Sequence, residues 1–163
     1  MAPSMLARVA TLAVAVAAAV AAAAAPAAAC SCALPPPLIE VAKAAEHVVR
    51  VKVTKTVFLP DPLEEQDKSA VWEGRVWSSF KGCTPRRIRL TSGANSALCG
   101  VRLTVGETYL FVLRAADPDG SYSVSSCDTF LRWANVKKAD RRALWRINSL
   151  VCPPQWTVRY FHK

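Results

Sequence analysis

Six cysteines constrain this chain more than any other feature, because all of them lie after residue 29 of 163. The first two form the closely spaced motif Cys30-Ser31-Cys32. An even number of cysteines in an exported chain indicates three disulfides. A structural zinc site is the alternative, but the chain has no C-x-x-C pair and its two histidines, His47 and His162, lie far apart. We therefore expect disulfides and no metal ion of the protein's own. The cysteines stand at positions 30, 32, 83, 99, 127 and 152.

Residues 1–29 have the pattern of a secretory signal peptide. Arg8 gives a short positive region, Thr11 to Ala25 is an unbroken apolar run, and Ala27-Ala28-Ala29 fits the small-x-small cleavage rule. The apolar run of about 15 residues is shorter than the roughly 20 that span a bilayer. We expect the mature protein to be secreted and extracellular, with no membrane span. Cleavage after Ala29 would make Cys30 the first residue, with a free α-amine.

Two other interpretations of this leader stay open. A signal anchor would keep the chain in the membrane, although the apolar run is short for that role. A bacterial lipoprotein signal would acylate Cys30 and abolish its free amine. Such signals usually carry Leu at the position that Ala27 occupies here.

The mature chain is expected to be one small basic domain. Removing the leader takes away Arg8 and no acid, so the formal charge falls from +9 to +8. Residues 30–163 are enough for a single domain, which we divide into a core of 30–152 and a short tail of 153–163. We expect it to be a monomer.

Hydrophobic periodicity predicts a mainly β domain with a short helix near each end. Val49, Val51 and Val53 alternate with polar residues, which is typical of a half-buried strand. Helical spacing of apolar residues predicts helices over 38–46 and 140–150. The proline segment 33–37 should be extended, residues 59–68 should form an exposed loop, and turns are expected at 106–107 and 117–120. The five expected strands, 48–58, 71–80, 86–91, 108–115 and 121–125, suggest a small Greek-key barrel.

A set of short motifs resembles the inhibitory domain of the tissue inhibitors of metalloproteinases (TIMP), within the wider class of netrin-like (NTR) modules. Each motif alone is weak, but together they cover nearly all of the mature chain in the right order. They are Cys30-Ser31-Cys32 with its proline segment, Val48-Val49-Arg50-Val51-Lys52-Val53, Phe80-Lys81-Gly82, Cys99-Gly100, Gly106-x-x-Tyr109-Leu110, Cys127-Asp128-Thr129-Phe130-x-x-Trp133, Arg141-Arg142 and Cys152.

The resemblance implies a five-stranded barrel of the oligonucleotide/oligosaccharide-binding (OB-fold) type with flanking helices. It also implies that Cys30 pairs with Cys99 and Cys32 with Cys127. The chain departs from the family at the third bridge, because Lys43 or a neighbour occupies the place of the family's cysteine in the first helix. Cys152 then pairs with Cys83, or both are free. The second domain of animal members is not expected, since eleven residues follow Cys152.

The resemblance further implies a function as a metalloendopeptidase inhibitor. A catalytic zinc keeps one coordination position open for water. The resemblance implies that the α-amine and carbonyl oxygen of the first residue, here Cys30, bind the zinc of the target protease. Ser31 would then face the primary specificity pocket. The other expected protease contacts are Cys32, Ala33, Leu34, Ala97, Leu98 and Cys99. The expected partners are zinc metalloproteases, whose zinc is the only metal involved.

Catalysis by the chain itself is not expected. The sequence contains no H-E-x-x-H, no G-x-S-x-G and no phosphate-binding loop. His47 opens a strand and is interpreted as a surface or turn residue rather than a base.

A non-inhibitory extracellular module that binds anionic glycans or matrix proteins is the alternative function. The net positive charge suits anionic glycans. Nucleic-acid binding is not expected, because the chain is exported and its five tryptophans are interpreted as core or rim residues rather than a stacking platform. The two candidate basic clusters are Arg86, Arg87 and Arg89, and Lys137, Lys138, Arg141 and Arg142; the tryptophans are Trp72, Trp77, Trp133, Trp145 and Trp156.

Overall fold

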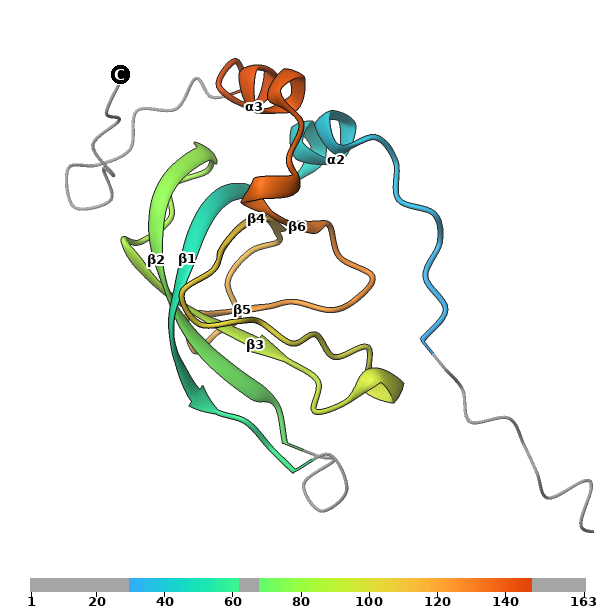
Figure 1. Cartoon of the computed structure of the whole chain (residues 1–163), viewed down its shortest axis with the longest axis vertical. Coiled ribbons are helices and arrows are strands. Elements are labelled where there is room, and N and C mark those ends of the chain that lie inside the picture. Colours follow the sequence, from blue (N-terminus) through green and yellow to red (C-terminus); the bar gives the residue numbers. More distant parts are fainter. Residues whose placement is uncertain (1–29, 62–67, 148–163) are drawn as a thin grey trace, which may run out of the picture.

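The computed structural model describes residues 30–61 and 68–147 (Figure 1). Within this part of the chain, six strands and two short helices are joined by loops that contain two turns of 3-10 helix. In chain order the elements are α2 (Leu38–Ala44), β1 (His47–Phe58), β2 (Ala70–Lys81), β3 (Arg87–Ser92), η1 (Ser96–Leu98), β4 (Thr108–Leu113), β5 (Ser121–Ser123), β6 (Phe130–Arg132), η2 (Trp133–Asn135) and α3 (Lys138–Leu144).

The strands form one sheet that curls into a half-barrel (Figure 1). Its order is β5-β3-β2-β1-β4-β6, in which β3 and β5 are parallel and the other neighbours antiparallel. The mainly β, OB-fold-like class predicted from the sequence is therefore confirmed, but the strand number of five was wrong. The sixth strand, β6, pairs with β4 at the edge of the sheet. It has only three residues, which is too short to show an alternation of apolar and polar residues.

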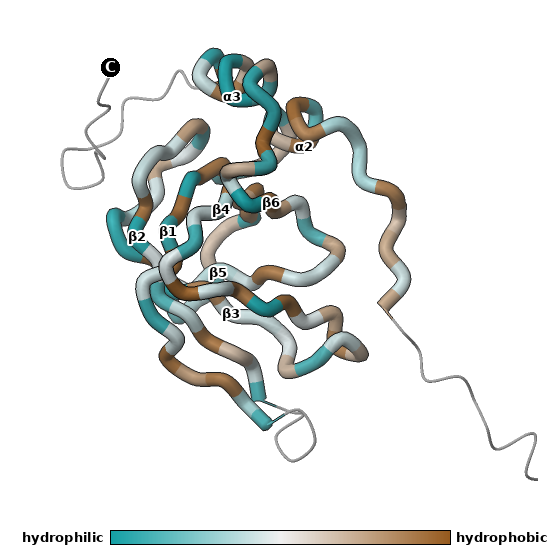
Figure 2. Tube along the Cα trace, in the orientation of Figure 1, coloured by the Kyte–Doolittle hydropathy of each residue, from teal (hydrophilic) through white to brown (hydrophobic). Residues whose placement is uncertain are grey.

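The main core fills the inside of the curled sheet. Alternation along β1 places Val49, Val51 and Val53 on the inner face, where all three are fully buried. Figure 2 shows the alternation of apolar and polar residues along β1 and β2. Trp72 and Phe111 are among the largest fully buried side chains of this core. The rest of the core consists of Ala70, Val76, Ile88, Leu90, Val101, Leu103, Tyr109, Leu113, Tyr122 and Val124.

A second, smaller core lies where the two helices cover one end of the sheet (Figure 1). Val48 and Leu110, from the outer face of β1 and β4, pack with Ala42 of α2 and Leu144 of α3. The predicted helix over 38–46 ends two residues early, because Ala45 has extended backbone angles. The predicted helix over 140–150 begins two residues early, at Lys138, and ends at Leu144; residues 145–147 form turns, and 148–150 lie outside the described part.

The other expectations for local structure have mixed outcomes. Turns with positive φ occur at Gly106 and Gly120, as predicted. The predicted loop 59–68 falls partly outside the described residues, which omit 62–67. Trp72 is a core residue, whereas Trp77 and Trp145 are about half exposed at the rim, and Trp156 lies outside the described part. Neither helix of the described residues is long and apolar enough to cross a membrane.

Candidate functional site

The start of the described chain is tied to the barrel by two disulfides. Cys30 is bonded to Cys99, with Cα atoms 5.3 Å apart, and Cys32 is bonded to Cys127, with Cα atoms 5.2 Å apart. These are the two pairings that the resemblance implies. The predicted contact residues therefore lie in two neighbouring segments, 30–34 and 97–99. We call these two segments the terminal ridge.

The loop that carries Cys99 is folded tightly on itself. Asn95 caps η1, because its side-chain oxygen accepts a hydrogen bond of 3.2 Å from the backbone N–H of Leu98. The N–H of Gly100 donates to the carbonyl oxygen of Asn95 at 2.8 Å. A Cβ atom on Gly100 would collide with the carbonyl oxygen of Gly93 and lie 2.7 Å from that of Asn95. Glycine at position 100 is therefore required for this loop to close.

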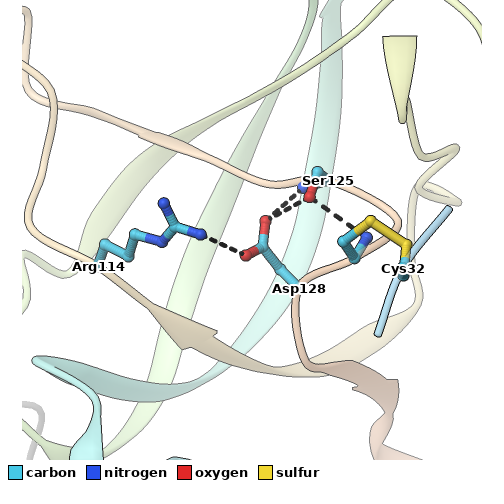
Figure 3. Close-up of polar contacts among 5 residues, drawn as sticks. Cys32, Arg114, Ser125 and Asp128 are labelled. Carbon is cyan, nitrogen blue, oxygen red and sulfur yellow. Dashed lines mark hydrogen bonds and ion pairs between the residues drawn. A yellow bond between two sulfur atoms is a disulfide. The ribbon is translucent and has the colours of Figure 1, made fainter. Parts of the chain in front are cut away.

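The turn that carries Cys127 is closed by Asp128 (Figure 3). One carboxylate oxygen of Asp128 accepts hydrogen bonds from both the backbone N–H and the hydroxyl of Ser125, each 2.8 Å long. The hydroxyl oxygen of Ser125 in turn accepts from the N–H of Cys127 at 3.3 Å. The other carboxylate oxygen lies 3.6 Å from the guanidinium of Arg114, which is 90% exposed. Asp128 and Ser125 thus fix the backbone from which Cys127 reaches Cys32.

The loop and the turn are also bonded to each other. The N–H of Ser126 donates to the carbonyl oxygen of Cys99 at 2.7 Å. Just before the turn, the N–H of Val124 donates to the carbonyl oxygen of Thr91 in β3 at 2.8 Å. The two disulfides therefore attach segment 30–34 to a single hydrogen-bonded unit that continues the sheet.

Sequence reasoning quoted Asp128 only as part of a motif and missed the roles of Ser125 and Asp128. The available signal was their spacing, because a serine followed three residues later by an acid is a common way to close a turn through side-chain hydrogen bonds.

The ridge itself is exposed and apolar. Leu34 is 96% exposed and Leu98 is 51% exposed, and Ser31, Cys32, Ala33 and Ala97 are also exposed. Residues 33–36 are exposed and line a pocket of about 500 Å³ together with residues of α2 and β4. The disulfides, rather than buried side chains, hold the ridge in place. Exposed apolar groups of this kind are typical of a surface that binds another protein.

A cluster of three cysteine sulfurs, two in the ridge and one in the turn that carries Cys127, does not form a metal site. The Sγ atoms of Cys30, Cys32 and Cys127 lie within 4.8 Å of one another. A metal ion is bound by thiolates, and these sulfurs are already bonded in the two disulfides.

His47 and Cys83 lie where β1 begins and just after β2 ends. Cys83 is disulfide-bonded, and its predicted partner, Cys152, lies outside the described residues. His47 opens β1, as predicted, but it is half-buried rather than a surface residue. Its Nδ1 lies 3.0 Å from the hydroxyl of Thr84, and its ring packs edge-on against Tyr122. Burial lowers the pKa of His47, against a smaller opposing effect of Glu46.

The two predicted basic clusters lie on different elements. Arg87 and Arg89 are exposed on β3. In the second cluster, Arg141 folds back onto its own chain, donating from Nε to the carbonyl oxygen of Val136 at 2.9 Å. Its guanidinium also lies over the ring of Trp133.

Comparison with known proteins identifies the family. A sequence model described as "Tissue inhibitor of metalloproteinase" matches residues 28–159, which is most of the chain. A comparison with curated proteins gave no match. Members of the matched family are extracellular inhibitors of metalloproteinases, not enzymes. The chain belongs to the tissue inhibitor of metalloproteinase family.

Proposed function

We propose that the mature protein inhibits a zinc metalloendopeptidase by placing the α-amine and carbonyl oxygen of Cys30 on the zinc of its target. The observation that carries this proposal is the double attachment of the terminal segment. Cys30 and Cys32 are both bonded to a loop and a turn that are themselves joined by the hydrogen bond from Ser126 to Cys99. The proposal requires cleavage after Ala29, because only then does Cys30 carry an α-amine.

The rigidity of the ridge supports tight binding. A catalytic zinc has three protein ligands and an open position for water. A bidentate group at that position displaces the water that hydrolysis needs. Since the two disulfides hold the terminal segment before docking, little conformational freedom is lost in the complex.

The exposed residues beside Cys30 supply the remaining contacts. Ser31 faces the specificity pocket in this proposal, and Ala33 and Leu34 lie along the substrate groove. Ala97 and Leu98 extend the same apolar surface, because Cys99 is bonded to Cys30. The protein needs no cofactor for this function, since the zinc belongs to the target.

The test compares the secreted protein with a variant that carries one extra alanine before Cys30. Intact-mass analysis first establishes that Cys30 is the unmodified terminus. We expect the extra residue to weaken inhibition at least about a hundredfold, which corresponds to about 2.8 kcal/mol of binding free energy. The unfolding midpoint should be unchanged, because the addition lies outside the barrel. Equal inhibition by the extended protein, or an acylated Cys30 in an active inhibitor, would contradict the proposal.

A pH series provides a second test of the same ligand. The α-amine has an ordinary pKa of about 7.7 to 8.0, and only its neutral form binds a metal ion. Inhibition should therefore weaken as the pH falls below this range. A constant affinity between about pH 6 and 8.5, after correction for the protease's own titration, would exclude the amine as a ligand.

A further inference from the structure

Three basic residues form a row across the outer face of the sheet, on the side opposite the main core. In the strand register, Lys52 of β1 is paired with Arg75 of β2, and Arg75 is paired with Arg87 of β3. Their chain neighbours Val51, Val76 and Ile88 point inward and are buried. Side chains paired across strands lie about 5 Å apart at Cβ. The row therefore concentrates three positive charges on adjacent strands.

This arrangement is unfavourable for the isolated protein. Like charges directly opposite each other in a sheet repel and reduce stability. Strands β1, β2 and β3 together contain seven Lys or Arg residues and one acid, Glu73. Glu73 lies in the next row, between Lys55 and Arg89. Within residues 30–61 and 68–147, no ion pair neutralises Lys52, Arg75 or Arg87.

The positive surface continues from the row toward α3 through Arg50. The guanidinium of Arg50 lies 5.0 Å from the ring centre of Trp77 and 4.7 Å from that of Trp133. Arg141 lies 4.8 Å from Trp133, so two guanidinium groups share one indole. The Nε of Arg50 is buried and has no hydrogen-bond partner among residues 30–61 and 68–147. Burial, with a further effect of Arg141, lowers the pKa of Arg50.

An anionic ligand would reduce the repulsion within the row by neutralising its charges. It would also bind the guanidinium groups that the tryptophans hold. We propose that this outer face, formed by Arg87, Arg75, Lys52, Arg50 and Arg141, binds an anionic polysaccharide. The charges follow a line across several strands, which suits a linear polyanion better than a single small anion. None of these residues belongs to the terminal ridge, so the proposal is independent of protease inhibition.

Two observations favour a polysaccharide over a nucleic acid. The disulfides of the described part form in oxidising compartments outside the cytosol. Trp77 is the exposed aromatic residue of this face, but Arg50 and Lys52 already lie against its ring. It therefore serves to orient cations rather than to stack bases.

The test measures binding of the mature protein to dextran sulfate, with neutral dextran of the same chain length as the uncharged probe. The variant Lys52→Gln/Arg75→Gln removes two neighbouring members of the row. The control Arg102→Gln removes the same type of charge from an exposed residue in the loop before β4, outside the three strands. Arg75→Gln/Arg87→Gln is a second double variant, which keeps the test decisive if the first fails to fold.

We expect dextran sulfate to bind and neutral dextran not to bind. Each double variant should weaken binding about tenfold at low salt and reduce its salt dependence. Arg102→Gln should change the affinity less than about twofold, since it leaves the row intact. The unfolding midpoints of the double variants should be unchanged or higher, because charge repulsion is removed.

Three results would overturn the proposal. The first is a loss of affinity in Arg102→Gln of about threefold or more, because attraction to net charge alone would give about half the logarithmic effect of a variant that removes two charges. The second is tighter binding of duplex DNA than of dextran sulfate at equal charge, which would assign the face to nucleic acid. The third is tighter binding of polyglutamate, which would assign it to an acidic protein. The extra alanine before Cys30 should leave polysaccharide binding unchanged, so a failure of the inhibition test can be recognised separately.

Discussion

In the barrel, the residues that maintain the structure are hidden from solvent: Trp72 is 1% exposed and Phe111 is fully buried. In the terminal ridge, Leu34 is 96% exposed, and the chain is held by disulfides and backbone hydrogen bonds. The hydrophobic effect thus stabilises the first region, and covalent attachment fixes the second. This difference allows the ridge to present apolar side chains to a partner without weakening the core.

The largest expected effect tests whether buried apolar side chains stabilise the barrel. Trp72→Ala removes the largest fully buried side chain and should reduce the free energy of unfolding by about 3 to 5 kcal/mol. The molecules that remain folded should inhibit as well as the original protein, because both bridges are retained. Urea unfolding and the inhibition constant of the folded fraction check the two parts. A loss below about 1 kcal/mol would show that Trp72 is not a core residue.

Removal of one bridge tests the ridge side. Cys32→Ser/Cys127→Ser opens a bridge that spans 95 residues of sequence, and should cost about 2 to 4 kcal/mol. Inhibition should weaken in the folded protein, unlike in Trp72→Ala, because the terminal segment keeps only the bond from Cys30 to Cys99. Unfolding and inhibition are measured under conditions where both variants are folded. Unchanged inhibition would break the comparison, since rigidity of the ridge would then be irrelevant.

A smaller effect is expected at the turn that supports Cys127. Asp128→Ala leaves two donors of Ser125 without their acceptor and should cost about 1 kcal/mol. Arg114→Gln is the matched control, because the ion pair is long and Arg114 is exposed; its cost should be close to zero. Chemical unfolding of both variants provides the measurement. Equal costs would show that the ion pair, not the hydrogen bonds, closes the turn.

The smallest effect concerns pH and tests the barrel without touching the ridge. Because the folded pKa of His47 lies below 6.5, the unfolded chain takes up the proton first as the pH falls. The contribution of neutral His47 to the free energy of unfolding is therefore fully present above pH 6.5 and is lost as the pH falls toward the folded pKa. Between about pH 7 and 5.5, the unfolding free energy of His47→Gln should depend less on pH than that of the original protein. Parallel curves for the two proteins would exclude His47 as the source.

Much of the barrel could be predicted from the sequence because burial on one face imposes alternation, as in Val49, Val51 and Val53. Strand β6 could not, since three residues that pair with β4 leave no periodic signal. The half-burial of His47 depends on Tyr122, which lies far away in sequence. A composition-based interpretation has no access to such a contact.

The candidate sites, too, could be predicted only in part. The bridges of Cys30 and Cys32 were expected only from the resemblance, because spacing alone does not determine connectivity. The basic row was missed, since Lys52, Arg75 and Arg87 are far apart in sequence and only the strand register aligns them. The sequence indicated the cluster of Arg86, Arg87 and Arg89, but not its continuation across the sheet.

The sulfurs of Cys30 and Cys32 in the ridge lie close to that of Cys127 in the turn, and this closeness has a consequence for the durability of the protein. With Cys30, Cys32 and Cys127 within 4.8 Å of one another, a thiolate released by reduction of one bridge has the other bridge within reach. Attack on a neighbouring disulfide exchanges the partners without any net change in oxidation. A small thiol that opens one bridge as a mixed disulfide, and is then expelled by a second protein thiolate, can therefore leave both bridges oxidised but with Cys30 bonded to the wrong cysteine. Such a molecule would retain its barrel and lose the geometry of its terminus.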